Sequence, residues 1–203
     1  MKGALRSIAQ QLGPEYFVRK TSIFKDSADG ILSGYCFDRA SKQQHFYIWA
    51  FCLPLYVPHE VLSLLFGQRI GGGCASWYLD PSGANVSDIL SLLNSKENIE
   101  ITSIGTATAF LQRFETEGLS TKPNTHTQEA VAYSYAKVGR LAECIHLLRV
   151  LIARFTEMEH ARHWEVAQLA RAEAVLHAAE LGPSAVADIL CVWERETRQS
   201  LLL

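Results

Sequence analysis

Residues 45–53 read HFYIWAFCL, and this apolar stretch decides the architecture of the first part of the chain. Apolar side chains stand at both odd and even positions, and aromatic residues are frequent. That pattern is typical of a central strand that is covered on both faces of its sheet. Pro54 and Pro58 follow. Neither proline can donate to a ladder of hydrogen bonds, so the strand must leave the sheet or run along its edge at this point.

Further strands are expected on both sides of this stretch, joined by connections short enough to favour antiparallel neighbours. The candidate strands are 16–24, 31–38, 61–70 and 76–79. For the third of these, a helix over 61–66 is the alternative. A short helix over 4–12 precedes them, and two helices follow, one from Asn85 and one over 106–117.

The chain changes character near residue 120, where aromatic and glycine-broken sequence gives way to alanine- and leucine-rich sequence. Four helices are expected over 128–138, 141–155, 162–181 and 184–199, with a polar linker at 119–127. One apolar stripe of helical spacing must be buried, and it consists of Leu141, Ile145, Leu148, Ile152 and Phe155. The sequence therefore predicts an α+β protein. Residues 1–120 form an antiparallel sheet of four or five strands with flanking helices. Residues 121–203 form a bundle of about four helices that packs against it.

Two local patterns resemble known families. The helical hairpin over 128–155, turned at Gly139, resembles a tetratricopeptide-type repeat at its small, aromatic and turn positions, which include Tyr135, Cys144 and Leu148. The resemblance implies a surface of the kind that binds proteins. Residues 53–58, followed by 66–70, look like a pattern in uncharacterised bacterial proteins of the DUF4304 kind, which implies an α+β fold and no assigned chemistry.

Composition excludes several classes of function. The net charge is −2 and no block of lysine and arginine occurs, so nucleic acid is not an expected partner. The longest apolar stretch, 46–57, is too short to span a bilayer. Five cysteines are scattered without CxxC pairing, as reduced core cysteines are, which indicates a cytoplasmic protein. No cofactor motif is present.

The segment Arg69-Ile-Gly-Gly-Gly-Cys74 carries the first group of candidate site residues. Its glycines match neither GxxxxGK[ST] nor GxGxxG, so a turn is the preferred interpretation. Cys74 is a candidate nucleophile if His45 or His59 lies beside it and lowers its pKa. Arg69 is a candidate binding residue for a carboxylate or phosphate, but an ion pair to Asp80 or Asp38 is the preferred interpretation.

The helical part carries the second group. The densest cluster of metal-ligand side chains consists of Glu157, Glu159, His160 and His163. A solvated turn between two helices is nevertheless the preferred interpretation, so no metal is expected. Trp164 and Trp193 are expected to anchor helix packing, and an exposed one would mark a contact surface. The C-terminal Leu201, Leu202 and Leu203 either pack back on the fold or form a hook for a partner or a second copy.

No catalytic constellation stands out from these candidates. The sequence therefore predicts a non-enzymatic protein-binding module of a bacterial cytoplasm, such as an adaptor or an immunity-type protein. Its partner is another protein, and a homo-oligomer is also compatible with the sequence. The alternative is a small cysteine-dependent hydrolase or transferase that uses Cys74 with His45 or His59.

Overall fold

The computed structural model describes residues 1–73, 75–116, 124–156, 162–201 and 203. Its contacts divide the chain into two compact units. The sheet unit comprises Met1–Leu53 and Leu62–Gly105, and the helical unit comprises Pro54–Val61 and Thr106–Leu203. The short segment between the two prolines therefore belongs to the helical unit, although it follows directly from the central strand of the sheet.

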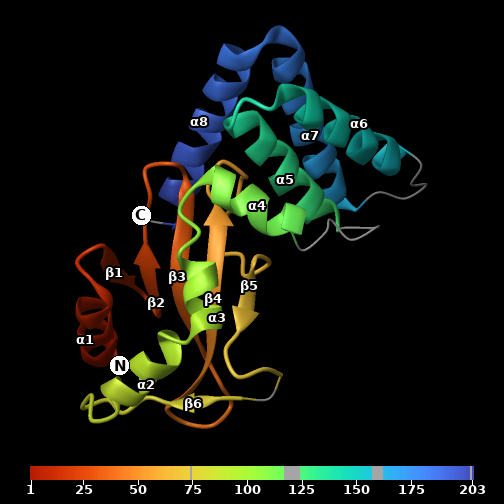
Figure 1. Ribbon diagram of the computed structural model, residues 1–203. Coiled ribbons are helices and arrows are strands. Elements are labelled where there is room, and N and C mark those ends of the chain that lie inside the picture. The colour runs from red at the N-terminus through yellow and green to blue at the C-terminus, as the bar shows by residue number, and fades with distance from the viewer. Residues whose placement is uncertain (74, 117–123, 157–161, 202) are drawn as a thin grey trace. The chain divides into compact units, whose positions relative to one another are not determined.

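The structure confirms the predicted α+β fold (Figure 1). The N-terminal part of the chain forms an antiparallel sheet, and the C-terminal part forms helices that pack together. The strands are hydrogen-bonded in the order β1-β2-β3-β4-β5, and β6 also pairs with β4. The elements of this unit are α1 (Lys2–Leu12), β1 (Tyr16–Arg19), β2 (Ser22–Lys25), β3 (Ile31–Arg39), β4 (His45–Pro54), β5 (Gly67–Arg69), β6 (Trp77–Tyr78), α2 (Val86–Leu93) and α3 (Lys96–Thr102).

Two of the expected strands differ from the structure. The candidate over 16–24 is a hairpin, because the chain turns at Lys20, whose φ of 50° lies in the left-handed region. The candidate over 61–70 forms a strand only at β5, and the alternative helix over 61–66 is wrong. The chain leaves β4 at Pro54 and returns as β5, which pairs with β4. A tight turn precedes β5, and in it the Gly67 N–H donates to the Leu64 carbonyl at 3.0 Å.

Strand β4 is central, but only its second half is buried on both faces. Its first half alternates, so that Tyr47 and Trp49 are half-exposed while Phe46 and Ile48 are buried. The buried face is covered by helices of the same unit. On β3, the Tyr35 hydroxyl donates to the carbonyl of Leu93 at the end of α2, at 2.9 Å.

The helical unit contains α4 (Ala107–Thr116), α5 (Thr125–Lys137), α6 (Leu141–Thr156), α7 (His163–Leu181) and α8 (Pro183–Leu201). Helix α5 is its core, because every residue from Gln128 to Ala136 is buried and α4, α6, α7 and α8 all contact it. The side chain of Asn124 caps this helix by accepting from the Thr127 N–H at 2.8 Å. Gly182 ends α7 with φ 124°, and Pro183 begins α8, as expected from their sequence.

The predicted stripe on α6 is displaced by one residue over part of its length. Leu148 and Phe155 are buried as expected, whereas Leu141, Ile145 and Ile152 are only half-buried. Cys144 and Leu151 take the remaining buried positions. Helix α6 lies between two neighbours, α5 and α7, so its apolar arc is wider than a single stripe and its centre falls between the two contacts.

Candidate functional site

Arg69 is held by an aromatic ring and a backbone carbonyl. Its guanidinium carbon lies 3.7 Å from the ring centroid of Tyr47, and Nη2 donates to the Ala75 carbonyl at 3.0 Å. Among the residues that the structure describes, Arg69 forms no ion pair with Asp38 or Asp80, so the expected pairing is absent there. The Nε atom is buried and has no hydrogen-bond partner in that same part of the chain.

A cavity of about 340 Å³ lies beside this strand, but its chemistry does not suit an anion. The Gln68 side chain belongs to it and donates from Nε2 to Asn98 Oδ1 at 3.4 Å. Side chains alternate along a strand, so the Arg69 guanidinium on Tyr47 lies on the opposite face of β5 from Gln68. The residues that line the cavity include both Arg69 and Glu97, and the carboxylate of Glu97 opposes the binding of an anion there.

The proposed nucleophile–histidine pair is not assembled by the described residues. Cys74 lies outside them. His45 begins β4 in the sheet unit, where Nδ1 lies 3.3 Å from Ser76 Oγ. His59 belongs to the helical unit. The cysteine-dependent alternative therefore stays a prediction.

His59 occupies an environment that keeps its ring neutral. Burial lowers the pKa of His59 to about 4, and the positive charges of Arg171 and His126 add to the effect. Its backbone N–H donates to Thr197 Oγ1 on α8 at 3.4 Å, while its Nε2 is buried and unpartnered among the described residues. A general base works best with a pKa near the ambient pH, so an imidazole with this pKa is poorly suited to activate a thiol at neutral pH.

A buried carboxylate in the core of the helical unit was not anticipated from the sequence. Glu129 on α5 is completely buried and accepts hydrogen bonds from three side chains. They are Arg171, through Nε at 2.8 Å and Nη2 at 3.2 Å, Gln168 at 2.9 Å and Tyr133 at 3.1 Å. Both carboxylate oxygens are therefore satisfied, and the network joins α5 to α7 as a structural element.

The only signal in the sequence is an acidic residue, Glu129, directly before the mostly apolar run 130–136 of a core helix. Such a residue requires a cationic partner on a neighbouring helix, and Arg171 supplies it. Nothing in the spacing of 129 and 171 identifies that partner in advance, because the two residues lie on different helices.

The predicted metal cluster falls mostly outside the described residues, which exclude Glu157, Glu159 and His160. His163 is the first residue of α7 and is exposed. In the part of the chain that the structure describes, no group of three or more histidine, cysteine or acidic side chains is placed to hold a metal ion.

The two tryptophans of the last helices differ in their exposure. Trp193 is half-buried, and its ring lies 5.6 Å from that of Tyr133 in the core. Trp164 on α7 is 40% exposed. Its ring stacks on His126 at the start of α5, with centroids 5.0 Å apart and an interplanar angle of 27°. An exposed aromatic ring is thus fixed in position on the surface of the helical unit.

The C-terminal leucines follow the end of α8 closely. Leu201 is the last residue of that helix, and the Leu203 N–H donates to the Arg198 carbonyl at 2.9 Å. Both side chains are half-buried, while Leu202 lies outside the described residues. The bond from Leu203 to Arg198 spans five residues instead of the four of an α-helix, so it closes the end of α8 and does not extend it.

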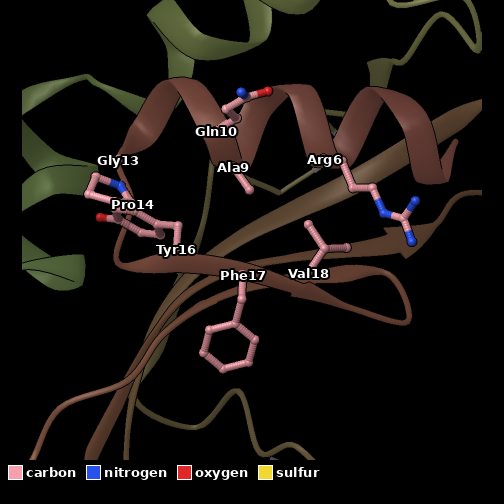
Figure 2. A pocket seen from close by; sticks show the side chains of 8 residues that line it. All are labelled: Arg6, Ala9, Gln10, Gly13, Pro14, Tyr16, Phe17 and Val18. Carbon is pink, nitrogen blue, oxygen red and sulfur yellow. The ribbon is translucent and has the colours of Figure 1, made fainter.

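A groove of about 430 Å³ runs between α1 and β1 in the sheet unit (Figure 2). Helix α1 contributes Arg6, Ala9 and Gln10, and strand β1 contributes Tyr16, Phe17 and Val18. Figure 2 shows Val18 and Ala9 between helix and strand, and Phe17 on the far side of the strand. Sequence analysis gave no reason to single out this groove, since none of its residues belongs to a chemical motif.

Comparison with known proteins returned no match to a family model, to a curated protein or to a solved structure. The resemblances to the tetratricopeptide-type repeat and to the DUF4304 pattern therefore stay predictions. Within the described ranges, no helix has the length and apolar character needed to cross a membrane.

Proposed function

We propose that this chain is a non-enzymatic protein-binding module, an adaptor or immunity-type protein of a bacterial cytoplasm, that contacts its partner through the helical unit. The observation that carries the proposal is the exposed Trp164 ring stacked on His126. Tryptophan is enriched among the residues that dominate the energy of protein interfaces. A ring already held by a stacked neighbour loses little conformational freedom when a partner covers it.

Other apolar side chains of the same unit support this proposal. Large apolar residues are exposed on each of α6, α7 and α8, and they include Val150 at 45%, Val166 at 53% and Val192 at 37%. The half-buried Leu201 and Leu203 add accessible apolar surface at the end of α8. Scattered exposed apolar residues are ordinary on a protein surface, so the proposal depends on the tryptophan and not on their number.

The experiment is affinity capture from a lysate of the source cell with the tagged full chain and two matched variants. Trp164→Ala removes the stacked ring, and Val150→Ala removes a side chain of similar exposure from α6. We expect one stoichiometric protein partner to be recovered by the wild-type chain and by Val150→Ala. Recovery with Trp164→Ala should fall at least tenfold, since central tryptophans contribute about 2 kcal/mol or more to such interfaces.

Thermal melting of each variant checks that the fold survives, because a partly exposed side chain on a helix surface contributes little to stability. A deletion of residues 201–203 then determines whether the tail contributes to the same contact. Recovery of a partner in equal amounts by all variants would refute the role of Trp164. Recovery of no partner by the wild-type chain would refute the proposed function.

A further inference from the structure

The exposed edge of the sheet supplies a second feature with the properties of a binding site. Strand β1 ends the hydrogen-bonded order of strands, so one of its two edges has no neighbouring strand among the described residues. An edge of this kind presents backbone N–H and C=O groups to which another extended chain can bind.

The register of the sheet identifies the outward-facing backbone groups. The carbonyl of Thr21, directly before β2, accepts from the Phe37 N–H of β3 at 2.9 Å, so the odd-numbered residues of β2 bond towards β3. Backbone groups alternate along a strand, so the even-numbered Ser22 and Phe24 bond towards β1, where their partners are Arg19 and Phe17. The N–H and C=O of Val18 consequently point away from the sheet.

The groove lies between α1 and β1, the strand that carries this edge (Figure 2). A strand added to β1 would lie about 4.8 Å beyond it, and every second side chain would point to the side on which α1 lies. On that side the groove of about 430 Å³ is lined by Ala9 and Val18 together with the stem of Arg6. One or two medium-sized apolar side chains fit into this volume.

The charges around the edge indicate which kind of segment binds there. Arg6, Arg19 and Lys20 are exposed, and none of the three forms an ion pair with a described residue. The nearest acid in sequence, Glu15, is already paired with Lys25 at 3.5 Å. Like charges across two such edges repel, so pairing of β1 with the same strand of a second copy is disfavoured.

We infer that the free edge of β1 and the adjoining groove bind an extended, acidic segment of a protein partner by addition of a strand. This inference rests on the proposed function and names the chemistry of the partner segment. The main-chain groups of Val18 hydrogen-bond to the segment, and the groove accepts its apolar side chains. The cationic residues Arg6, Arg19 and Lys20 pair with its carboxylates.

The test uses two displayed peptide libraries and the full chain as bait. Each peptide has nine residues, with alternate positions randomised over Val, Ile, Leu, Phe, Tyr and Thr. The other positions are Glu or Asp in one library and Lys or Arg in the second. We expect enrichment from the acidic library only, and binding of an enriched peptide, measured by fluorescence anisotropy, should weaken as salt is raised.

Two variants distinguish this site from other surfaces. Val18→Pro removes the outward N–H, and an edge strand tolerates proline at such a position. This variant should bind the peptide about tenfold more weakly, since a buried acceptor of the segment loses its donor. Arg6→Glu should weaken binding by a similar factor, whereas Arg195→Glu makes the same charge change on α8 and should leave binding unchanged. Circular dichroism and melting confirm that each variant folds, and Arg6→Glu keeps the test valid if Val18→Pro does not fold.

Failure to enrich acidic peptides, or undiminished binding by the folded edge variants, would overturn the inference. That outcome leaves the proposed function standing if Trp164→Ala still abolishes capture from the lysate. The opposite outcome, in which the peptides bind at β1 but the lysate yields no partner, refutes the proposed function alone.

Discussion

The buried imidazole of His59 makes a sharp prediction about acid stability. The ring has an ordinary pKa of 6.5 and a pKa of about 4 in the folded chain. The folded pKa is the lower one, so the unfolded chain takes up the proton first as the pH falls. The stabilisation is therefore complete above about pH 6.5 and is lost progressively between pH 6.5 and about 4.

The size of the effect follows from the difference between the two pKa values. Each unit of difference corresponds to about 1.4 kcal/mol, so a depression of this size removes roughly 3 kcal/mol from the free energy of unfolding over that interval. The cause is chiefly desolvation of the charged ring, because Nε2 is buried without a partner among the described residues. Arg171 and His126 add their positive charge.

The assay is urea unfolding of the full chain between pH 7.5 and pH 4, compared with the variant His59→Gln. Other groups titrate equally in both proteins, so the difference between the two curves of unfolding free energy isolates the ring. The wild-type chain should lose roughly 3 kcal/mol more than the variant on acidification. Parallel curves, or a ring that titrates near pH 6.5 in an NMR experiment on the folded chain, would show that His59 is not desolvated.

Three further predictions concern packing within each of the two units. Glu129→Gln leaves Arg171 without its carboxylate partner in the core. Urea unfolding should show that the free energy of unfolding falls by about 3–5 kcal/mol. A loss below about 1 kcal/mol would mean that the pair is solvated. Gly34→Ala drives a Cβ into the carbonyl oxygen of Ile23 on the neighbouring strand and should cost several kcal/mol. The control Gly3→Ala on α1 meets nothing within 4 Å and should leave stability unchanged or slightly higher. Equal melting temperatures of the two variants would contradict this reasoning. The exposed Cys191 should be alkylated by iodoacetamide in the native chain, and peptide mapping should find the buried thiols on β4 and α6 modified only after unfolding; native labelling of those thiols would contradict their burial.

The sequence was sufficient to predict the elements with strong periodicity. Strand β4 and helices α1, α6 and α7 lie within one or two residues of their expected bounds, because each is defined by a continuous apolar pattern. The region 61–70 was predicted less well. Its strand β5 has three residues, too few for a pattern, and pairing with β4 alone determines where it begins. Strand β6 lies within the range expected for it, 76–79.

The residues of the candidate sites illustrate a different limit of sequence reasoning. The sequence singled out Arg69 as a cation near glycines, but Tyr47, which stacks on it, lies on another strand. Similarly, Trp164 was recognised as either a packing anchor or a contact surface, and the choice depended on its exposure. In both cases the residue type was informative, while its role was decided by a neighbour that is distant in sequence.

The same argument explains why the edge of β1 was overlooked. Its residues Tyr16, Phe17 and Val18 read as an ordinary apolar strand, and nothing in that sequence states whether one or two neighbours pair with it. The edge exists because α1 precedes β1 and, in the part of the chain that the structure describes, no later strand returns to that side of the sheet. A main-chain binding site depends on which backbone groups remain unpaired, a property of topology and register. Motif analysis does not detect such a site, and the flanking cations Arg6 and Lys20 lie too far apart in the sequence to be recognised as a basic cluster.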